Sequence, residues 1–80
     1  MNKYLAKIKE IFDPKYYDVF SVYDADDRYL FGIRNKKYSG EPLDPYYTID
    51  KKTLKIRGFL PHMEKDVFRN AINHPVDWRL

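Results

Sequence analysis

The chain has 80 residues, a formal net charge of +3 and no cysteine, and 44% of its residues are hydrophobic and 18% aromatic. This length predicts one domain with a small core, and the apolar content excludes a fully disordered chain. The lack of cysteine excludes a disulfide framework and thiolate metal sites. The mildly basic charge leaves an acidic protein surface and nucleic acid both open as partners. We treat residues 1–80 as a single domain whose residues 76–80 form a tail.

The N-terminal segment predicts an amphipathic helix over residues 3–12. Its apolar residues recur at three- and four-residue spacing, and lysines occupy the other side. Asp13-Pro14 ends this helix, because the residue before a proline avoids helical backbone angles. The segment carries too many charges for a signal peptide, and the chain lacks the roughly 20 consecutive apolar residues of a membrane span. We therefore expect a cytoplasmic protein with no membrane partner.

Strands are predicted where aromatic and β-branched residues alternate with polar ones. These segments are residues 16–23, 28–34, 46–50 and 53–59. Asp24–Asp27 and Lys51-Lys52 are short polar links of the length that hairpins need, and turn-forming residues fill the stretch 35–45. Residues 62–73 predict a second helix, which Pro75 closes.

The predicted order is α-β-β-β-β-α, an α+β fold. We expect a four-stranded antiparallel meander with both helices packed on one face, because a meander needs a cover for its apolar side. The residues expected to be buried are Phe20, Phe31, Ile33, Ile49, Ile56 and Phe68. The opposite face mixes tyrosine, arginine and lysine with a few aliphatic residues.

This mixed face predicts a binding site for a partner. Tyrosine and arginine are enriched at protein–protein hot spots, and rings on an open sheet also stack nucleic-acid bases. The candidate partner-binding residues are Tyr17, Tyr23, Arg34, Tyr46, Arg57 and Trp78. The alternative is structural: a helix or the tail covers this face, and Trp78 returns to cap the core or to add an edge strand.

Charged residues near the strand ends are expected at the rim of such a site. They are Asp24, Asp26, Asp27, Lys36, Lys37, Lys51 and Lys52. The lysines either converge into one patch for phosphate or carboxylate groups or keep the strand ends soluble. The aspartates lack the glycine and glutamate of a calcium loop, so they predict a solvated turn or a contact for a basic partner.

No motif points to catalysis or to a bound group. His62 and His74 lie twelve residues apart, and no cysteine or clustered carboxylate completes a metal site. The sequence also lacks a glycine-rich phosphate loop and a nucleophile elbow. We expect no catalytic residues, no metal and no cofactor.

One stretch carries a family resemblance. Residues 46–56, followed by Gly58-Phe59-Leu60-Pro61 and a short helix, resemble the closing hairpin of small proteins encoded by phages and mobile elements. These include immunity proteins and inhibitors of host defence systems, and the resemblance implies a non-enzymatic protein that occludes a partner's surface. A glycine with positive φ is common where this chain has Leu54, so a tighter or different turn is expected. The resemblance assigns no functional residue.

The leading hypothesis is a non-enzymatic protein-binding module, of the inhibitor or immunity type. One alternative is a nucleic-acid-binding module that uses the basic hairpin ends. The other is a structural subunit that forms a homodimer through a sheet edge or the C-terminal tail.

Overall fold

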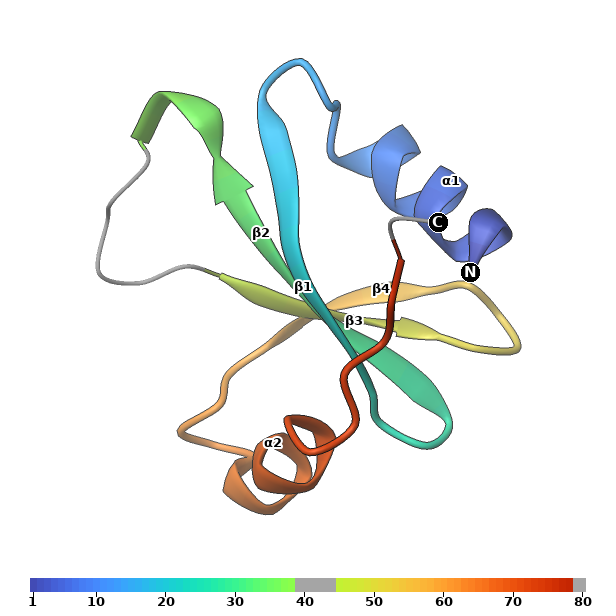
Figure 1. Ribbon diagram of the computed structural model, residues 1–80, viewed down its shortest axis with the longest axis vertical. Helices are drawn as coiled ribbons and strands as arrows, with labels where there is room; N and C mark the ends of the chain where they lie inside the picture. The colour runs from blue at the N-terminus through green and yellow to red at the C-terminus, as the bar shows by residue number, and fades with distance from the viewer. Residues whose placement is uncertain (39–44, 79–80) are drawn as a thin grey trace.

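Two helices enclose four consecutive strands in the part of the chain that the structure describes, in the predicted order (Figure 1). The computed structural model describes residues 1–38 and 45–78. Its elements are α1 (Asn2–Ile11), β1 (Tyr17–Asp24), β2 (Arg28–Asn35), the 3₁₀ helix η1 (Lys36–Tyr38), β3 (Tyr46–Asp50), β4 (Ile56–Phe59) and α2 (Lys65–Ala71). The α+β class is confirmed. Parts of the predicted irregular stretch and of the tail, residues 39–44 and 79–80, lie outside the described residues.

The strands form one antiparallel sheet in the order β1-β2-β3-β4. Consecutive strands are therefore neighbours, as in a meander, and β1 and β4 are the outer strands. The predicted strand over 53–59 begins later, at Ile56, because Thr53 belongs to the preceding turn. The second helix is also shorter than predicted, since residues 61–63 form a turn before it.

The two helices cover opposite faces of this sheet, so the prediction that both pack on one face is wrong. Ile8 of α1 is buried with Phe31 and Ile49 in a first core cluster. Ala71 of α2 is buried with Leu30 and Phe59 in a second core cluster. Neighbouring residues of a strand point to opposite faces, so Leu30 and Phe31 need separate covers. One-sided packing would have left the second group of apolar side chains in water.

A β-bulge in β1 moves Phe20 away from the predicted core face. The pairing with β2 shifts between Val19, which lies opposite Ile33, and Ser21, which lies opposite Gly32. The ring of Phe20 lies against Gly32, on the α2 side of the sheet. Val19 packs against the first core cluster instead. A bulge inserts one residue into the alternation, which a strict period of two does not anticipate.

The predicted core is confirmed in half of its members. Phe31, Ile33 and Ile49 are buried, as expected. Phe20, Ile56 and Phe68 are only half-buried. The fully buried side chains that were not predicted include Leu30, which the second helix covers.

We predict that Gly32→Ala destabilises the fold by about 1–3 kcal/mol, because an added Cβ overlaps the Phe20 ring and overpacking has costs of this size. Denaturant unfolding of the variant and of the Phe20→Leu/Gly32→Ala double variant measures the effect. The smaller leucine should recover part of the loss. Gly58→Ala is the matched control, since an added Cβ there meets nothing within 4 Å. A Gly32→Ala variant as stable as the control would contradict the ring-on-glycine contact.

Leu54 occupies the backbone conformation that usually favours glycine, with φ of 61°. The β3–β4 turn therefore keeps the positive φ that is common at this position, although the residue is leucine. A non-glycine residue in this region costs about 1–2 kcal/mol. Leu54 is half-buried against the first core cluster, and burial of a whole leucine side chain contributes about 1.5–3 kcal/mol. The two effects are of similar size, so packing offsets the backbone strain.

Two substitutions separate these effects. Leu54→Ala loses the packing and keeps the strain, so we expect a loss of about 1 kcal/mol or more in unfolding free energy. Leu54→Gly loses the packing but releases the strain, so its loss should be smaller. Chemical denaturation of both variants decides the order. A glycine variant less stable than the alanine variant would mean that the strain is negligible.

Candidate functional site

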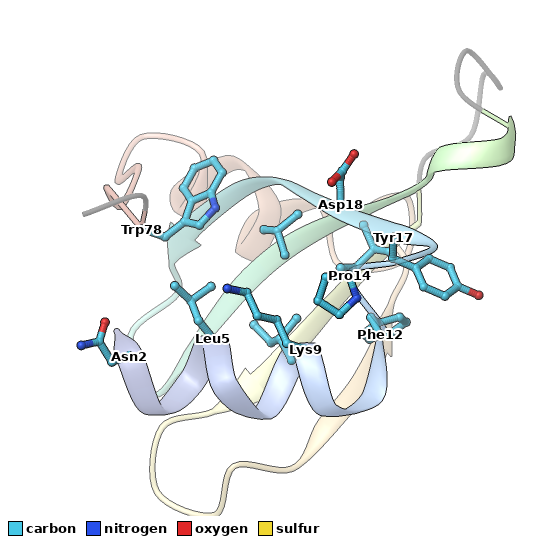
Figure 2. Close-up of a pocket in the computed structure, with 11 residues that line it drawn as sticks. Asn2, Leu5, Lys9, Phe12, Pro14, Tyr17, Asp18 and Trp78 are labelled. Atoms are coloured by element: carbon cyan, nitrogen blue, oxygen red, sulfur yellow. The ribbon is translucent and has the colours of Figure 1, made fainter.

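A groove of about 580 Å³ lies between α1 and β1 and is here called the α1–β1 groove (Figure 2). Its lining residues are Asn2, Leu5, Ile8, Lys9, Phe12, Pro14, Tyr17, Asp18, Val19, Ile33 and Trp78. In Figure 2, Leu5 and Lys9 rise from α1 toward β1, while Trp78 stands at one end and Tyr17 at the other. Most of this lining is apolar, which is typical of ligand and peptide sites.

The groove exists because α1 lies over β2 and β3 and leaves the outer strand beside it. Tyr4 of α1 packs edge to face on Tyr29 of β2, with ring centroids 4.9 Å apart. Its hydroxyl donates a hydrogen bond of 2.8 Å to the carbonyl of Lys51, the first residue of the β3–β4 turn. Phe12 then contacts Tyr47 of β3 with ring centroids 4.8 Å apart. These contacts tie both ends of the helix to the middle of the sheet.

The C-terminal tail closes one end of the groove. The N–H of Val76 donates to the carbonyl of Val22, and the N–H of Asp24 donates to the carbonyl of His74, both at 2.9 Å. The tail thus pairs with the second half of β1, through a bridge at Pro75. Trp78 is half-buried against the first core cluster. It therefore packs on the body of the protein and still lines the groove.

The rim of the groove has an excess of positive charge. Asp18 has its carboxylate 3.6 Å from the ammonium of Lys36, so this negative charge is compensated. Lys9 is exposed, and no ion pair of its side chain is found within the described part of the chain. Residues 1–19, which supply most of the lining, have a net charge of +1.

The predicted partner-binding residues do not share one surface. Tyr17 lies in the groove on the α1 face, together with Trp78, so its assignment to the other face is wrong. Tyr23 and Tyr46 pack against the second core cluster beneath α2, as the structural alternative expected. Tyr46 contacts the ring of Phe68 in α2, with centroids 5.4 Å apart. These two tyrosines therefore contribute to the fold.

The two predicted arginines remain on the surface of the α2 face. Arg34 is exposed, and its guanidinium lies 5.1 Å from the ring centroid of Phe20. Arg57 is also exposed and lines a smaller hollow of about 240 Å³. All the residues that line this hollow are polar or charged, and they include the carboxylates of Asp27 and Asp50. Cations and carboxylates of the protein thus already face each other there.

The two lysine pairs do not converge into one patch. Lys36 and Lys37 follow the last residue of β2. Lys51 and Lys52 lie near the opposite end of this strand, because its first residue, Arg28, pairs with Asp50. Eight strand residues separate the two places, which at about 3.3 Å per residue is more than 20 Å. The structure therefore does not form the single anion site that the sequence left open.

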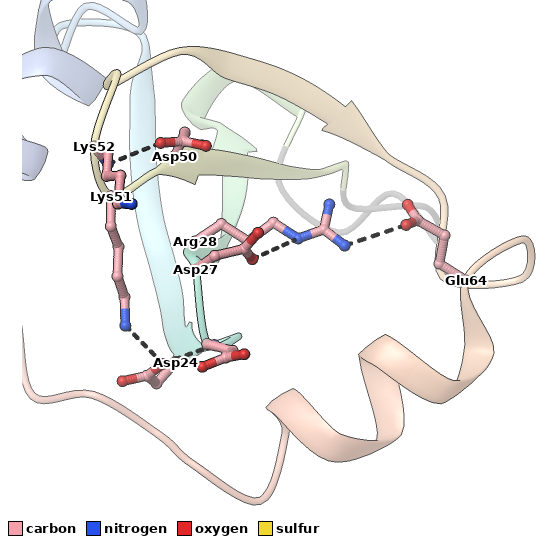
Figure 3. A network of polar contacts seen from close by, with 8 residues as sticks. Asp24, Asp27, Arg28, Asp50, Lys51, Lys52 and Glu64 are labelled. Carbon is pink, nitrogen blue, oxygen red and sulfur yellow. Dashed lines mark hydrogen bonds and ion pairs between the residues drawn. The ribbon is translucent and has the colours of Figure 1, made fainter.

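The acidic link between β1 and β2 takes part in ion pairs that join elements of the fold (Figure 3). The carboxylate of Asp24 lies 2.9 Å from the ammonium of Lys51 in the β3–β4 turn. Arg28 lies between Asp27 and Glu64, at 3.9 Å and 3.3 Å, and so connects β2 to the residue that precedes α2. Asp26 has a positive φ of 70° and its N–H donates to Asp24, as in a tight turn. The link is therefore structural in part.

The pKa values of this network follow from its contacts. The hydrogen bond from Lys51 is the main cause that holds the pKa of the Asp24 carboxyl below its ordinary value of 3.8. The same bond raises the pKa of the Lys51 ammonium. The backbone N–H groups of Thr53 and Lys52 lower the pKa of Asp50. Both carboxylates are thus held in their ionised form.

We predict that the hydrogen bond between Lys51 and Asp24 stabilises the fold by an amount that depends on pH. Because the folded pKa of Asp24 is lowered, its contribution is present above the ordinary value of 3.8 and is lost as the pH falls through the lowered pKa. Asp24→Asn should lower the unfolding free energy at pH 7 by less than about 1 kcal/mol, as for a partly exposed pair. The wild type and the variant should converge in strong acid. Urea unfolding across this pH range measures both, and a constant difference at every pH would contradict the assignment.

The described residues form no candidate metal site. Within residues 1–38 and 45–78, no group of three or more His, Asp or Glu side chains is close enough to hold a metal ion. His62 and His74 are both exposed. Among the described helices, none is long and apolar enough to cross a membrane.

The sequence reasoning missed the groove residues Leu5, Lys9 and Val19. Leu5 belongs to an apolar helix stripe, which predicts core, and Lys9 belongs to the polar side of the same helix. The bulge reverses the face of Val19. Nothing in the sequence alone places these three residues beside one another.

Comparisons of the chain with protein-family models, with curated proteins and with solved structures give no match.

Proposed function

We propose that this protein is a non-enzymatic module that binds a segment of another protein in the α1–β1 groove. The observation that carries the proposal is the groove itself, with its apolar lining and about 580 Å³ of volume. This volume falls within the range of about 300–1,000 Å³ that is usual for ligand sites. Aromatic residues at both ends, Trp78 and Tyr17, are of the types that most often anchor protein partners.

The charge of the groove indicates the chemistry of the partner. Lys9 supplies a positive charge without an ion pair among the described residues, and Asp18 is compensated by Lys36. A segment with large apolar side chains and a carboxylate is therefore complementary to the lining and to the rim. A basic segment would instead be repelled by the ammonium of Lys9. The partner that we propose is an acidic, apolar peptide segment.

The resemblance of residues 46–61 to phage and mobile-element proteins supports a finer proposal. Such proteins act by covering a surface of their target, without chemistry. A groove that holds one projecting segment of a target is consistent with an inhibitor or immunity-type protein. In the structure these residues form β3, β4 and the turn before α2, so they support the sheet and do not line the groove.

The test starts from a displayed library of random twelve-residue peptides that is selected on the full-length protein. We expect acidic, apolar sequences to be enriched. A labelled peptide of this kind should bind about 2 kcal/mol or more weakly to Trp78→Ala, as expected for an anchor. Lys9→Glu should weaken binding by about 0.5–1 kcal/mol and slow association. The matched control is Lys65→Glu, an equal charge change on an exposed lysine of α2.

Fluorescence polarisation of the labelled peptide gives the affinities, and thermal melting of each variant checks the fold. Trp78 is the only tryptophan of the chain, so its emission reports whether the peptide enters the groove. The proposal fails if no peptide is enriched, or if the enriched peptides bind Lys9→Glu and Trp78→Ala as tightly as the wild type. Tight, salt-sensitive binding of oligonucleotides to the same face would replace it with the nucleic-acid alternative. A dimer in light scattering whose formation blocks the peptide would replace it with self-association.

A further inference from the structure

The edge of β1 that borders the groove has backbone groups directed outward. The N–H of Ile33 donates to the carbonyl of Pro45, at 3.1 Å, so the backbone groups of Ile33 point toward β3. Val19 lies directly opposite Ile33 in the antiparallel pair. In an antiparallel pair, the N–H and C=O groups of two opposite residues either bond to each other or all point away from the partner strand. The N–H and C=O of Val19 therefore point to the open side of the sheet.

Two of the neighbouring outward groups on this edge have partners. The N–H of Tyr17 donates to the carbonyl of Asp13, at 2.9 Å, and the carbonyl of Val22 accepts from Val76, at 2.9 Å. Between these two places, no backbone hydrogen bond of Val19 outside the β1–β2 ladder is found within residues 1–38 and 45–78. The open part of the edge is thus short, and it lies beside the groove.

The tail shows what this edge accepts. Residues 74–76 run antiparallel to the second half of β1 and form two backbone hydrogen bonds with it. Two residues after Val76, the side chain of Trp78 reaches the groove. An extended segment on the edge of β1 thus places a large apolar side chain in the groove. The chain itself supplies an example of the geometry.

We infer that the partner segment binds as an extended strand on the edge of β1. The residue opposite Val19 exchanges two backbone hydrogen bonds with it. Side chains of opposite residues point to the same face, so this residue directs its side chain into the groove, over Val19 and Ile33. Residues two positions away share that face and meet Lys9 and the two ends of the groove. This inference rests on the proposed function, because it specifies how the same segment is held.

A helical segment in the groove fits the structure less well. The N–H and C=O groups of a helix bond to each other, so a helix would cover the edge without bonding to the backbone of Val19. The N–H and C=O of Val19 would then lose their contact with water and gain no hydrogen bond in exchange. The bulge after Val19 also limits the added strand to a short stretch, since bulges interrupt regular pairing. The expected ligand is therefore a short segment with an apolar residue at the central position.

The experiment uses a peptide that the library selection enriches, with each backbone amide methylated in turn. A strand that bonds through alternate amides should lose at least tenfold in affinity when the N–H that donates to Val19 is methylated. Methylation of the next amide along, which points away from β1, should have little effect. In the ¹⁵N-labelled protein, hydrogen exchange of the Val19 amide should slow at least tenfold on saturation. The exposed amide of Lys65 at the start of α2 is the internal control.

The two proposals fail in different ways. If no peptide binds, or if binding ignores the groove variants, the proposed function itself is wrong. If a peptide binds with the expected dependence on Trp78 and Lys9, but tolerates methylation at every amide, the strand inference alone is overturned. An unchanged hydrogen-exchange rate of the Val19 amide in the saturated complex would also overturn the strand inference alone. Helix-promoting substitutions in the peptide that tighten binding would point to the helical mode.

Discussion

The alternation of side chains across the pleated sheet is the constraint on which the rest of this structure depends. Leu30 and Phe31 are adjacent in β2 and both fully buried, so each face of the sheet needs a cover. A chain of 80 residues supplies one short helix to each face. With ten residues, α1 is only about 15 Å long, and it packs on β2 and β3. The groove beside β1 is the part of the first face that this helix leaves open.

The bulge at Phe20 connects the two faces and the edge. By inserting one residue, it sends Val19 to the α1 side and Phe20 to the α2 side, where the ring takes the space that Gly32 leaves. An aromatic ring over a strand glycine is a known way of compensating for the missing side chain. Without the bulge, Val19 would not line the groove, and Phe20 would compete for the space between α1 and the sheet. The floor of the proposed site is thus a consequence of local strand geometry.

The sequence predicts the elements of this fold well and its faces less well. Periods of 3.6 and 2 locate the helices and strands, because each is a local property of the chain. The side on which α2 packs is not local. It depends on Leu30 and Phe59, which share a face only once the register is known. The bulge is also hidden, since the adjacent apolar residues Val19 and Phe20 would equally suit a regular strand that is buried on both faces.

The candidate site shows the same limit. Tyr17 and Trp78 were selected from the sequence for their residue type, and the groove does contain them. Their position relative to Leu5, Lys9 and Val19 arises from contacts between residues far apart in the chain, which composition and spacing do not contain. Tyr23 and Tyr46, selected by the same reasoning, support the second core cluster instead. Residue type therefore identifies candidates, and the packing of the two helices decides which of them remain accessible.

The edge of β1 combines two properties that usually conflict. An open strand edge is useful for binding, yet it also invites pairing with other copies of the chain. Here residues 74–76 cover the second half of the edge, and the carbonyl of Asp13 accepts a hydrogen bond from the N–H of Tyr17. The bulge interrupts regular strand pairing between these two places. Among the described residues, the backbone of Val19 remains open beside the groove, close to Lys9, whose side chain forms no ion pair there. Such a short edge cannot support the pairing of whole sheets. A ligand that also fills the groove is stabilised both by hydrogen bonds to the edge and by apolar contacts in the groove. The restriction of the open edge thus favours a specific segment over nonspecific strands.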